Sequence, residues 1–197
     1  PKKLIDNLYR YRFGEAFDFD LQGLATPVLP SPDSEHWTMT DLASVAIGYA
    51  VAETPLHILT FYSAIANKGR MMRPYIVESV EKDGRIVKKK GPSVLNGAVC
   101  SREVADSLTS GLLSITSEGT ASRLKDAKLR VAGKTGTAWV YMDPKQASRT
   151  DPFMDREGRR KYQATFVGFF PAEQPKYTAI VVLYSYPTKD AVFGGSI

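Results

Sequence analysis

The sequence is poor in the residues that build disulfide frameworks and metal centres. It has one cysteine, Cys100, and two histidines, His36 and His57, among 197 residues. One cysteine excludes an internal disulfide and a cysteine-cluster metal site, and two histidines are too few for a histidine-rich site. We therefore expect the chain to use no metal ion and no cofactor.

Long hydrophobic runs and compositional bias are also missing. No stretch approaches the roughly 18 apolar residues that suggest a membrane span. The 15 glycines and 12 prolines are scattered without a period, which excludes a collagen-like or low-complexity chain. With 43% hydrophobic and 24% charged residues, the composition is that of a folded globular protein.

The excess of positive charge is small: 26 Lys and Arg against 21 Asp and Glu, a net charge of +5. Nucleic-acid binding would need basic residues on one face, preferably beside stacking aromatic side chains. The basic runs at 88–90 and 156–161 instead lie after a turn and in a polar stretch. We expect solvated loops and no nucleic-acid partner, with one alternative for the second run. It could line a site for an anionic substrate through Arg156, Arg159, Arg160 and Lys161.

Neither end of the chain has the features of a natural terminus. Pro1 is not an initiator residue, and a helix pattern starts directly at Lys2. Residues 191–197 are apolar and glycine-rich, without a polar tail. We therefore expect residues 1–197 to be a segment of a longer protein, cut at both ends.

Helix signals fill the first part of the chain. Hydrophobic periodicity predicts helices over 2–12, 40–47 and 56–68 and after Ser101, with Thr40 and Asp41 capping the second and Thr54-Pro55 starting the third. Asp83-Gly84 predicts a small β-hairpin between the third and the fourth of these helices. After Lys125 three β segments follow, at 129–141, 162–170 and 177–186, joined by loops. Such strands are most simply antiparallel, so we predict an α+β fold, an antiparallel sheet with flanking helices.

The most informative stretch is Gly133-Lys134-Thr135-Gly136-Thr137-Ala138. Gly-Lys-Thr also occurs in phosphate loops, but that motif needs an earlier glycine where this chain has Lys128, and a helix where this chain has β-forming residues. The phosphate-loop interpretation therefore fails.

A strand with a catalytic edge explains the same residues. Gly136 lacks a Cβ, so a substrate backbone can approach closely. Lys134 offers a positive charge, and Thr135 and Thr137 offer hydroxyls that can hold a carboxylate. Alternation places the two threonines on one face of the strand and Lys134 on the other. An extended peptide can add to such an edge by strand pairing.

Lys-Thr-Gly is one of the motifs of penicillin-binding proteins and serine β-lactamases, and the rest of the chain fits that family. It resembles the C-terminal part of a class B penicillin-binding protein, a peptidoglycan D,D-transpeptidase. Its sequence is more similar to the division-type members than to the elongation type. Phe193-Gly194-Gly195 is similar to the aromatic-Gly-Gly before the family's last helix. The other matching stretches are Ala46-Ile47-Gly48-Tyr49, Thr54-Pro55-Leu56, Tyr62-Ser63-Ala64-Ile65-Ala66-Asn67-Lys68-Gly69, Arg73-Pro74, Glu118-Gly119-Thr120-Ala121, Val131 to Ala138 and Ala164 to Ala172.

The resemblance implies a mechanism and a setting. A serine of a Ser-x-x-Lys motif attacks the D-Ala-D-Ala bond of a stem peptide, and an amine of a second stem peptide takes the acyl group; β-lactams acylate the same serine. Lys134 would stabilise charge and assist proton transfer, Thr135 and Thr137 would bind the carboxylate, and the Thr137 backbone would join the oxyanion hole. The implied location is the extracytoplasmic face of the inner membrane, anchored by an upstream helix, with divisome or other cell-wall synthesis proteins as partners.

Two family motifs are not found convincingly. Ser-x-x-Lys occurs as Ser79 to Lys82 and Ser122 to Lys125, but neither fits the start of a buried helix far upstream of Lys-Thr-Gly. Ser-x-Asn does not occur. We therefore expect both motifs before Pro1, in the missing N-terminal part of the protein, and this segment to be inactive alone.

Alternative functions stay open at this point. A hydrolase of the same fold, a β-lactamase or D,D-carboxypeptidase, would release opened drug or free D-Ala. A non-catalytic β-lactam-binding sensor module would lack the upstream serine. Among single residues, we expect His57 to be structural rather than a base, and the helix that follows Cys100 could lower the pKa of its thiol.

Overall fold

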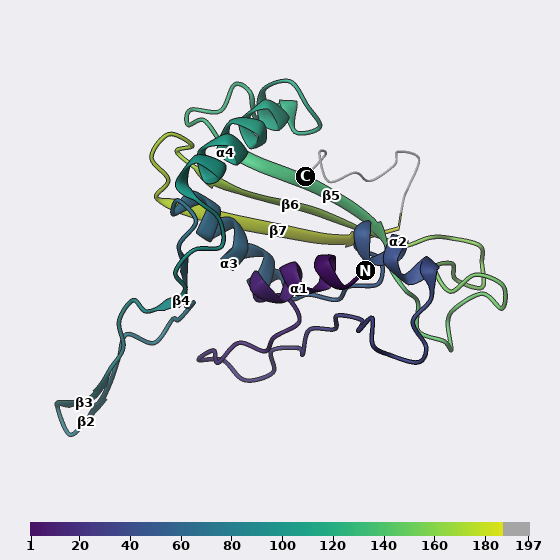
Figure 1. The fold of residues 1–197 in the computed structure, drawn as a ribbon, viewed down its shortest axis with the longest axis horizontal. Coiled ribbons are helices and arrows are strands. Elements are labelled where there is room, and N and C mark those ends of the chain that lie inside the picture. Colours follow the sequence, from purple (N-terminus) through teal and green to yellow (C-terminus); the bar gives the residue numbers. More distant parts are fainter. Residues whose placement is uncertain (187–197) are drawn as a thin grey trace. The chain divides into compact units, whose positions relative to one another are not determined.

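A computed structural model of the chain describes residues 1–186. The described elements fall into two compact units, one formed by residues 1–104 and one that begins at residue 105 (Figure 1). Helices dominate the first unit, and an antiparallel sheet dominates the second. The predicted α+β class, an antiparallel sheet with flanking helices, is therefore confirmed. The predicted Phe193-Gly194-Gly195 motif lies outside the described residues.

The first unit contains three helices and two small pairs of strands. The second pair, β2 and β3, is the hairpin that Asp83-Gly84 predicted, and both turn residues have positive φ. The pairing of β1 with β4 was not predicted, because strands of two and three residues carry no periodic signal. The elements are α1 (Lys2–Arg10), α2 (Met39–Ala46), α3 (Pro55–Ala66), β1 (Met71–Met72), β2 (Ser79–Lys82), β3 (Arg85–Lys89) and β4 (Val94–Asn96).

Caps fix where these helices begin. Thr54 caps α3 as predicted: its side chain accepts a hydrogen bond from the backbone of His57, and Pro55 occupies the first turn. The predicted cap of α2 was wrong. Thr38 is the N-cap, and Asp41 is the third helical residue, whose carboxylate accepts a 2.6 Å hydrogen bond from the Thr38 backbone N–H. This reciprocal arrangement satisfies an amide that would otherwise lack a partner.

The hairpin is exposed along its whole length, and a buried carboxylate holds it at its root. Figure 1 shows it extending away from α1 and α3. The Asp20 carboxylate lies at the root and accepts hydrogen bonds from the backbone of Ile76 (2.8 Å) and Val77 (3.0 Å) and from the Lys90 ammonium. The Lys90 hydrogen bond is the main reason why the pKa of Asp20 falls to about 2. One ionised side chain therefore connects the loop at residue 20 with both ends of the hairpin.

The core of the first unit forms around Ala64, Met71 and Val99. Cys100 packs against this cluster, and burial raises the pKa of its thiol, an effect that the nearby Arg10 partly opposes. The sequence left open a lowered pKa through the helix that follows Cys100; the pKa is raised instead, because burial disfavours the charged thiolate.

His57 is buried and fully hydrogen-bonded, as predicted for a structural histidine. Its Nε2 lies 2.7 Å from the backbone carbonyl oxygen of Glu15, and its Nδ1 lies 2.7 Å from the Thr54 hydroxyl. The ring also stacks on Phe17. Burial lowers the pKa of His57, because the charged imidazolium is disfavoured away from water. The ring therefore serves to join the start of α3 to the loop after α1.

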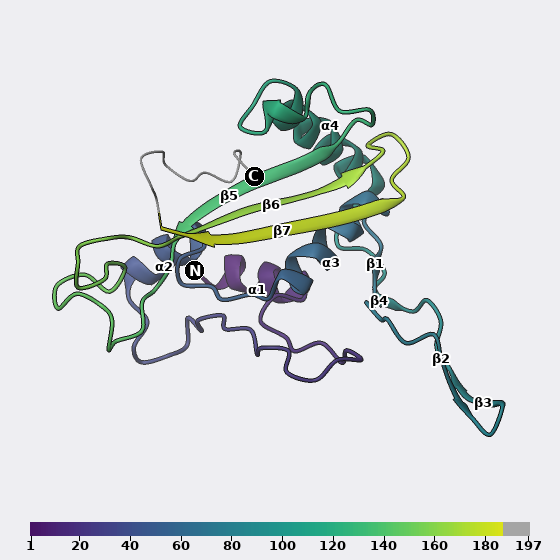
Figure 2. The ribbon, with the colours of Figure 1, turned by 180° about the vertical axis from the view of Figure 1, so that it is seen from behind.

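Between residues 105 and 186, the second unit contains most of one long helix, a short 3₁₀ helix and three strands. Figure 2 shows the strands side by side from behind, with β5 and β7 at the two edges. The Thr116 hydroxyl near the end of the helix donates a hydrogen bond to the carbonyl of Val131, which fixes the helix end beside the first strand. The elements are α4 (Arg102–Ser117), η1 (Ser122–Leu124), β5 (Ala132–Trp139), β6 (Tyr162–Phe170) and β7 (Tyr177–Ser185).

The sheet is regular. β6 pairs antiparallel with β5 on one side and with β7 on the other, and neither register contains a bulge. Phe169 and Ala164 of the central strand are fully buried, as is Ala132 of β5. Among residues 1–186, no helix is both long and apolar enough to cross a membrane, and no group of three or more His, Cys, Asp or Glu residues gathers to hold a metal ion.

Candidate active site

The predicted site residues all lie on β5, at an edge of the three-stranded sheet. Lys134 pairs with Val167, Thr135 with Phe166 and Thr137 with Ala164, in an unbroken register. Side chains of a regular strand alternate, so Lys134 and Gly136 share one face of the sheet, and Thr135 and Thr137 share the other. Both threonines therefore stand on one face, as the sequence predicted.

Lys134 is an exposed residue of β5. It donates a 2.7 Å hydrogen bond to the backbone carbonyl of Thr135, and among residues 1–186 no carboxylate forms an ion pair with it. Its charge is therefore available to an anion that approaches the strand.

Thr120 is a neighbour of the site that the sequence did not place there. Its hydroxyl lies 2.8 Å from the hydroxyl of Thr135. The loop that carries Thr120 follows α4, and Gly119 at this point has no room for a Cβ, which would lie 2.8 Å from the Cα of Ile115. The tight turn thus brings the Thr120 hydroxyl to the face of β5 that carries Thr135 and Thr137. The Glu118-Gly119-Thr120-Ala121 stretch was a family signal in the sequence, but nothing in its pattern indicated this contact.

The two glycines of β5 differ in what surrounds them. A Cβ at Gly133 would lie 2.5 Å from Cζ of Phe166 and 2.8 Å from the carbonyl oxygen of Val167. A Cβ at Gly136 would meet only the Cβ of Thr165, at an ordinary 3.8 Å. Packing of the described residues therefore explains Gly133 but gives no reason for Gly136, whose open surroundings suit the close approach of a ligand.

The far end of β5 leads into the loop of residues 140–161. The Arg160 guanidinium lies over the Trp139 ring, 3.9 Å from its centroid, and also donates a 2.6 Å hydrogen bond to Asp151. Phe153 packs against Trp139, with 6.1 Å between ring centroids. These contacts order a loop that the sequence showed only as polar.

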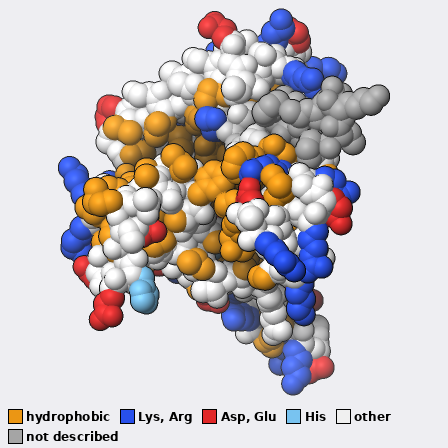
Figure 3. Space-filling view, turned by 90° about the vertical axis from the view of Figure 1, so that its right-hand side faces the viewer, with side chains coloured by type: hydrophobic (Ala, Val, Ile, Leu, Met, Phe, Trp, Pro, Cys, Tyr) orange, Lys and Arg blue, Asp and Glu red, His pale blue; other side chains and the backbone are white. Residues whose placement is uncertain are grey.

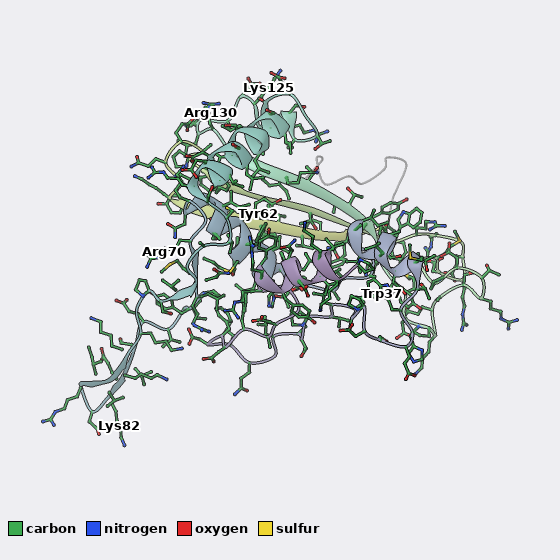
Figure 4. The ribbon with its side chains drawn as sticks, viewed as in Figure 1. Trp37, Tyr62, Arg70, Lys82, Lys125 and Arg130 are labelled. Atoms are coloured by element: carbon green, nitrogen blue, oxygen red, sulfur yellow. The ribbon has the colours of Figure 1, made fainter. Side chains whose placement is uncertain are left out.

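The two Ser-x-x-Lys matches lie in places unsuited to a nucleophile. Ser79 and Lys82 belong to the exposed strand β2, and Ser122 is the exposed first residue of the three-residue η1. Figure 4 shows Lys82 at the end of the hairpin and Lys125 on the segment after α4. Neither lysine donates a hydrogen bond to the serine of its own match. Both matches are therefore best interpreted as coincidences.

Comparison with known proteins assigns this sheet and its helices to a family. The family described as the penicillin-binding protein transpeptidase domain matches residues 1–193. The chain belongs to this family. The resemblance to a class B penicillin-binding protein, drawn from the motifs alone, is thereby confirmed.

Similar proteins are much longer than this chain. Stage V sporulation protein D of Bacillus subtilis is 30% identical over 200 residues, which is 100% of this chain and 28% of that protein. Peptidoglycan D,D-transpeptidase FtsI of Escherichia coli is 26% identical over 197 residues, which is 98% of this chain and 29% of that protein. The chain thus spans less than a third of either relative.

A solved structure shares the fold. Penicillin-binding protein 3 of Mycobacterium tuberculosis, in complex with aztreonam, superposes with a TM-score of 0.76 at 25% identity, over 95% of this chain and 40% of that one. Penicillin-binding protein 2B of Streptococcus pneumoniae, at 22% identity and a TM-score of 0.72, shows the same fold.

Proposed function

We propose that the chain is the Lys-Thr-Gly-bearing part of a peptidoglycan D,D-transpeptidase, which crosslinks the cell wall and is acylated by β-lactams. The observation that carries the proposal is the edge strand β5. It presents the exposed Lys134, whose ammonium forms no ion pair with any residue between 1 and 186, and the hydroxyls of Thr135 and Thr137. The name of the Escherichia coli relative and the aztreonam complex of the mycobacterial protein support it.

In this proposal the reaction has two steps. A serine Oγ attacks the carbonyl of the penultimate D-Ala, the peptide bond breaks, and the terminal D-Ala leaves with the serine proton on its amine. An amine of a second stem peptide then attacks the ester, and the serine recovers a proton. A β-lactam stops after the first step, because its leaving nitrogen stays tethered to the acyl group.

The residues of β5 would bind and orient rather than attack. Thr135 and Thr137 hydroxyls would hold the acid tail of the donor peptide, and the Lys134 ammonium would stabilise developing charge and assist proton transfer. Gly136 would let the peptide backbone lie against the strand. The Thr137 backbone N–H would serve the oxyanion hole, where a fixed donor contributes about 3 kcal/mol.

The nucleophile would come from a part of the protein before Pro1. The chain spans 28% of the sporulation protein and 29% of the Escherichia coli transpeptidase, which leaves ample length for Ser-x-x-Lys, Ser-x-Asn and an anchoring helix. We place the complete protein at the extracytoplasmic face of the inner membrane, with a role in division and with divisome proteins among its partners.

The test uses the parent protein and fluorescent penicillin. Lys134→Ala should lower the rate of covalent labelling by about a hundredfold, the scale of losing one charge-stabilising donor. Ser122→Ala, which removes the serine of the coincidental motif, should label like the wild type. Equal losses in both variants would contradict the assignment of the site, and so would labelling of residues 1–197 alone. Crosslinked peptide dimers as product would separate the transpeptidase from a hydrolase that releases free D-Ala or opened drug.

A further inference from the structure

The loop between β5 and β6 contains an open pocket that the site described above does not use. The pocket has a volume of about 370 Å³. Figure 3 faces the side of the molecule where Figure 1 draws this loop, and Lys and Arg side chains are spread over it among hydrophobic ones. The residues that line the pocket are Met142, Lys145, Gln146, Asp155, Arg156, Glu157, Arg159 and Tyr186.

Asp155 is the buried acidic residue that lines the pocket. Its carboxylate accepts hydrogen bonds from the backbone N–H groups of Glu157 (3.0 Å) and Arg159 (2.8 Å) and from Nε of Arg159 (2.9 Å). Burial works to raise the pKa of Asp155, but the hydrogen bonds and the charge of Arg159 outweigh it and lower the pKa. The carboxylate therefore stays ionised, and it holds the loop in a fixed turn.

Both acidic residues that line the pocket form ion pairs with the same arginine. Arg159 pairs with Asp155 at 2.9 Å and with Glu157 at 3.4 Å, and its guanidinium lies 5.0 Å from the centroid of the Tyr186 ring. Lys145 and Arg156, in contrast, are exposed and form no ion pair with any residue between 1 and 186. Two cationic side chains on the rim are therefore left to attract an anion.

The chain path relates this pocket to the edge of β5. Met142 lines the pocket only three residues beyond Trp139, the last residue of β5, and strands rise about 3.3 Å per residue. A peptide that pairs antiparallel with β5, with its acid tail held near Thr135 and Thr137, has its upstream residues directed toward Trp139 and the loop.

We propose that this pocket binds a second carboxylate of the donor peptide, on a side chain upstream of the D-Ala-D-Ala tail. Lys145 would act as a point charge, and Arg156 would present the planar fork that matches a carboxylate in two hydrogen bonds. The amide of Gln146 is a further donor on the same wall. The inference rests on the proposed function, because that function supplies the peptide and its direction along β5.

Calorimetric titration of the parent protein with paired peptides tests the inference. The probes are N-acetylated heptapeptides that end in D-Ala-D-Ala and carry one Glu, or Gln in its place, at a position three to six residues before the end. At the position that reaches the pocket, the Glu peptide should bind about two- to fivefold more tightly, the upper part of the range for exposed ion pairs. Salt should reduce the preference by screening.

Two double variants provide the comparison. Lys145→Gln with Arg156→Gln should abolish the preference for Glu. Lys128→Gln with Lys176→Gln removes two exposed charges of the same unit near the other end of the sheet and should leave the preference intact. Equal binding of Glu and Gln peptides at every position, no binding of either, or a preference that survives loss of Lys145 and Arg156 would overturn the inference. Labelling of the same preparation by fluorescent penicillin reports separately on the proposed function.

Discussion

Replacing each of the two glycines of β5 by alanine separates two effects, the packing of the strand and the approach of a ligand to its edge. Gly133→Ala should destabilise the protein, because the new methyl group would lie 2.5 Å from Phe166 Cζ and 2.8 Å from the Val167 carbonyl oxygen. The carbonyl belongs to the backbone of β6, which cannot rotate away, so overpacking should cost about 1–3 kcal/mol. At about 2–4 °C per kcal/mol for a domain of this size, the melting temperature should fall by several degrees.

Gly136→Ala should give the opposite combination of effects. The nearest atom outside its neighbours is the Thr165 Cβ at 3.8 Å, and the φ of Gly136 is not positive. Alanine should therefore leave the melting temperature unchanged or raise it slightly, since it restricts the unfolded chain by about 0.4–1 kcal/mol. A methyl group beside the strand edge should nevertheless obstruct a peptide or a β-lactam, and the acylation rate should fall at least tenfold.

The measurements are thermal unfolding followed by circular dichroism and the rate of labelling by fluorescent penicillin in the parent protein. If Gly136→Ala unfolds as early as Gly133→Ala, the packing account of β5 is wrong. If Gly136→Ala is stable and labels at the wild-type rate, the peptide does not lie against this strand edge.

Two further predictions concern ionised groups of the first unit. Asp20→Asn should speed hydrogen exchange of the Ile76 and Val77 amides, because it removes the charge that binds both N–H groups and Lys90; Asp33→Asn, in an exposed loop, should not, and unchanged exchange in Asp20→Asn would refute the anchor. His57, whose folded pKa is lowered below the ordinary 6.5 by burial, should make the protein less stable as the pH falls below about 6.5, because the unfolded chain takes up the proton first. Burial raises the pKa of Glu53, so this residue makes the folded protein more stable as the pH falls toward 4.5, opposite to the effect of His57. The test is therefore the His57 pKa itself, measured by NMR and assigned with His57→Gln. A value at or above 6.5 would contradict the burial argument.

Local signals predicted most of the elements. Thr54-Pro55, Ser101 and Asp83-Gly84 marked boundaries that the structure confirms, since caps and turns depend on residues a few positions apart. The α2 cap failed within the same range, because Thr38 and Thr40 are both suitable residues and the choice depends on which one Asp41 reaches. The β1–β4 pair failed for another reason: its partners are more than twenty positions apart and too short to show a pattern.

The candidate site shows the same difference between features set by the local sequence and features set by tertiary packing. Alternation along β5 placed Lys134 on one face and Thr135 and Thr137 on the other, since it follows from the strand alone. The contact of Thr120 with Thr135, in contrast, depends on the tight turn at Gly119 and on where α4 ends. Such contacts are set by tertiary packing, which no local pattern encodes.

The loop of residues 140–161 shows why a charge count from the sequence does not tell which charges are available to a ligand. Four basic residues at 156–161 look like one solvated run, yet the structure gives them different tasks. Arg159 neutralises buried Asp155, and Arg160 pairs with Asp151 while it covers Trp139. Arg156 forms no ion pair with any residue between 1 and 186, and it lines the same pocket as Lys145, which lies eleven positions earlier. The charge available to a ligand is therefore a property of which acids the fold brings to which bases, and it differs from the net charge of the segment.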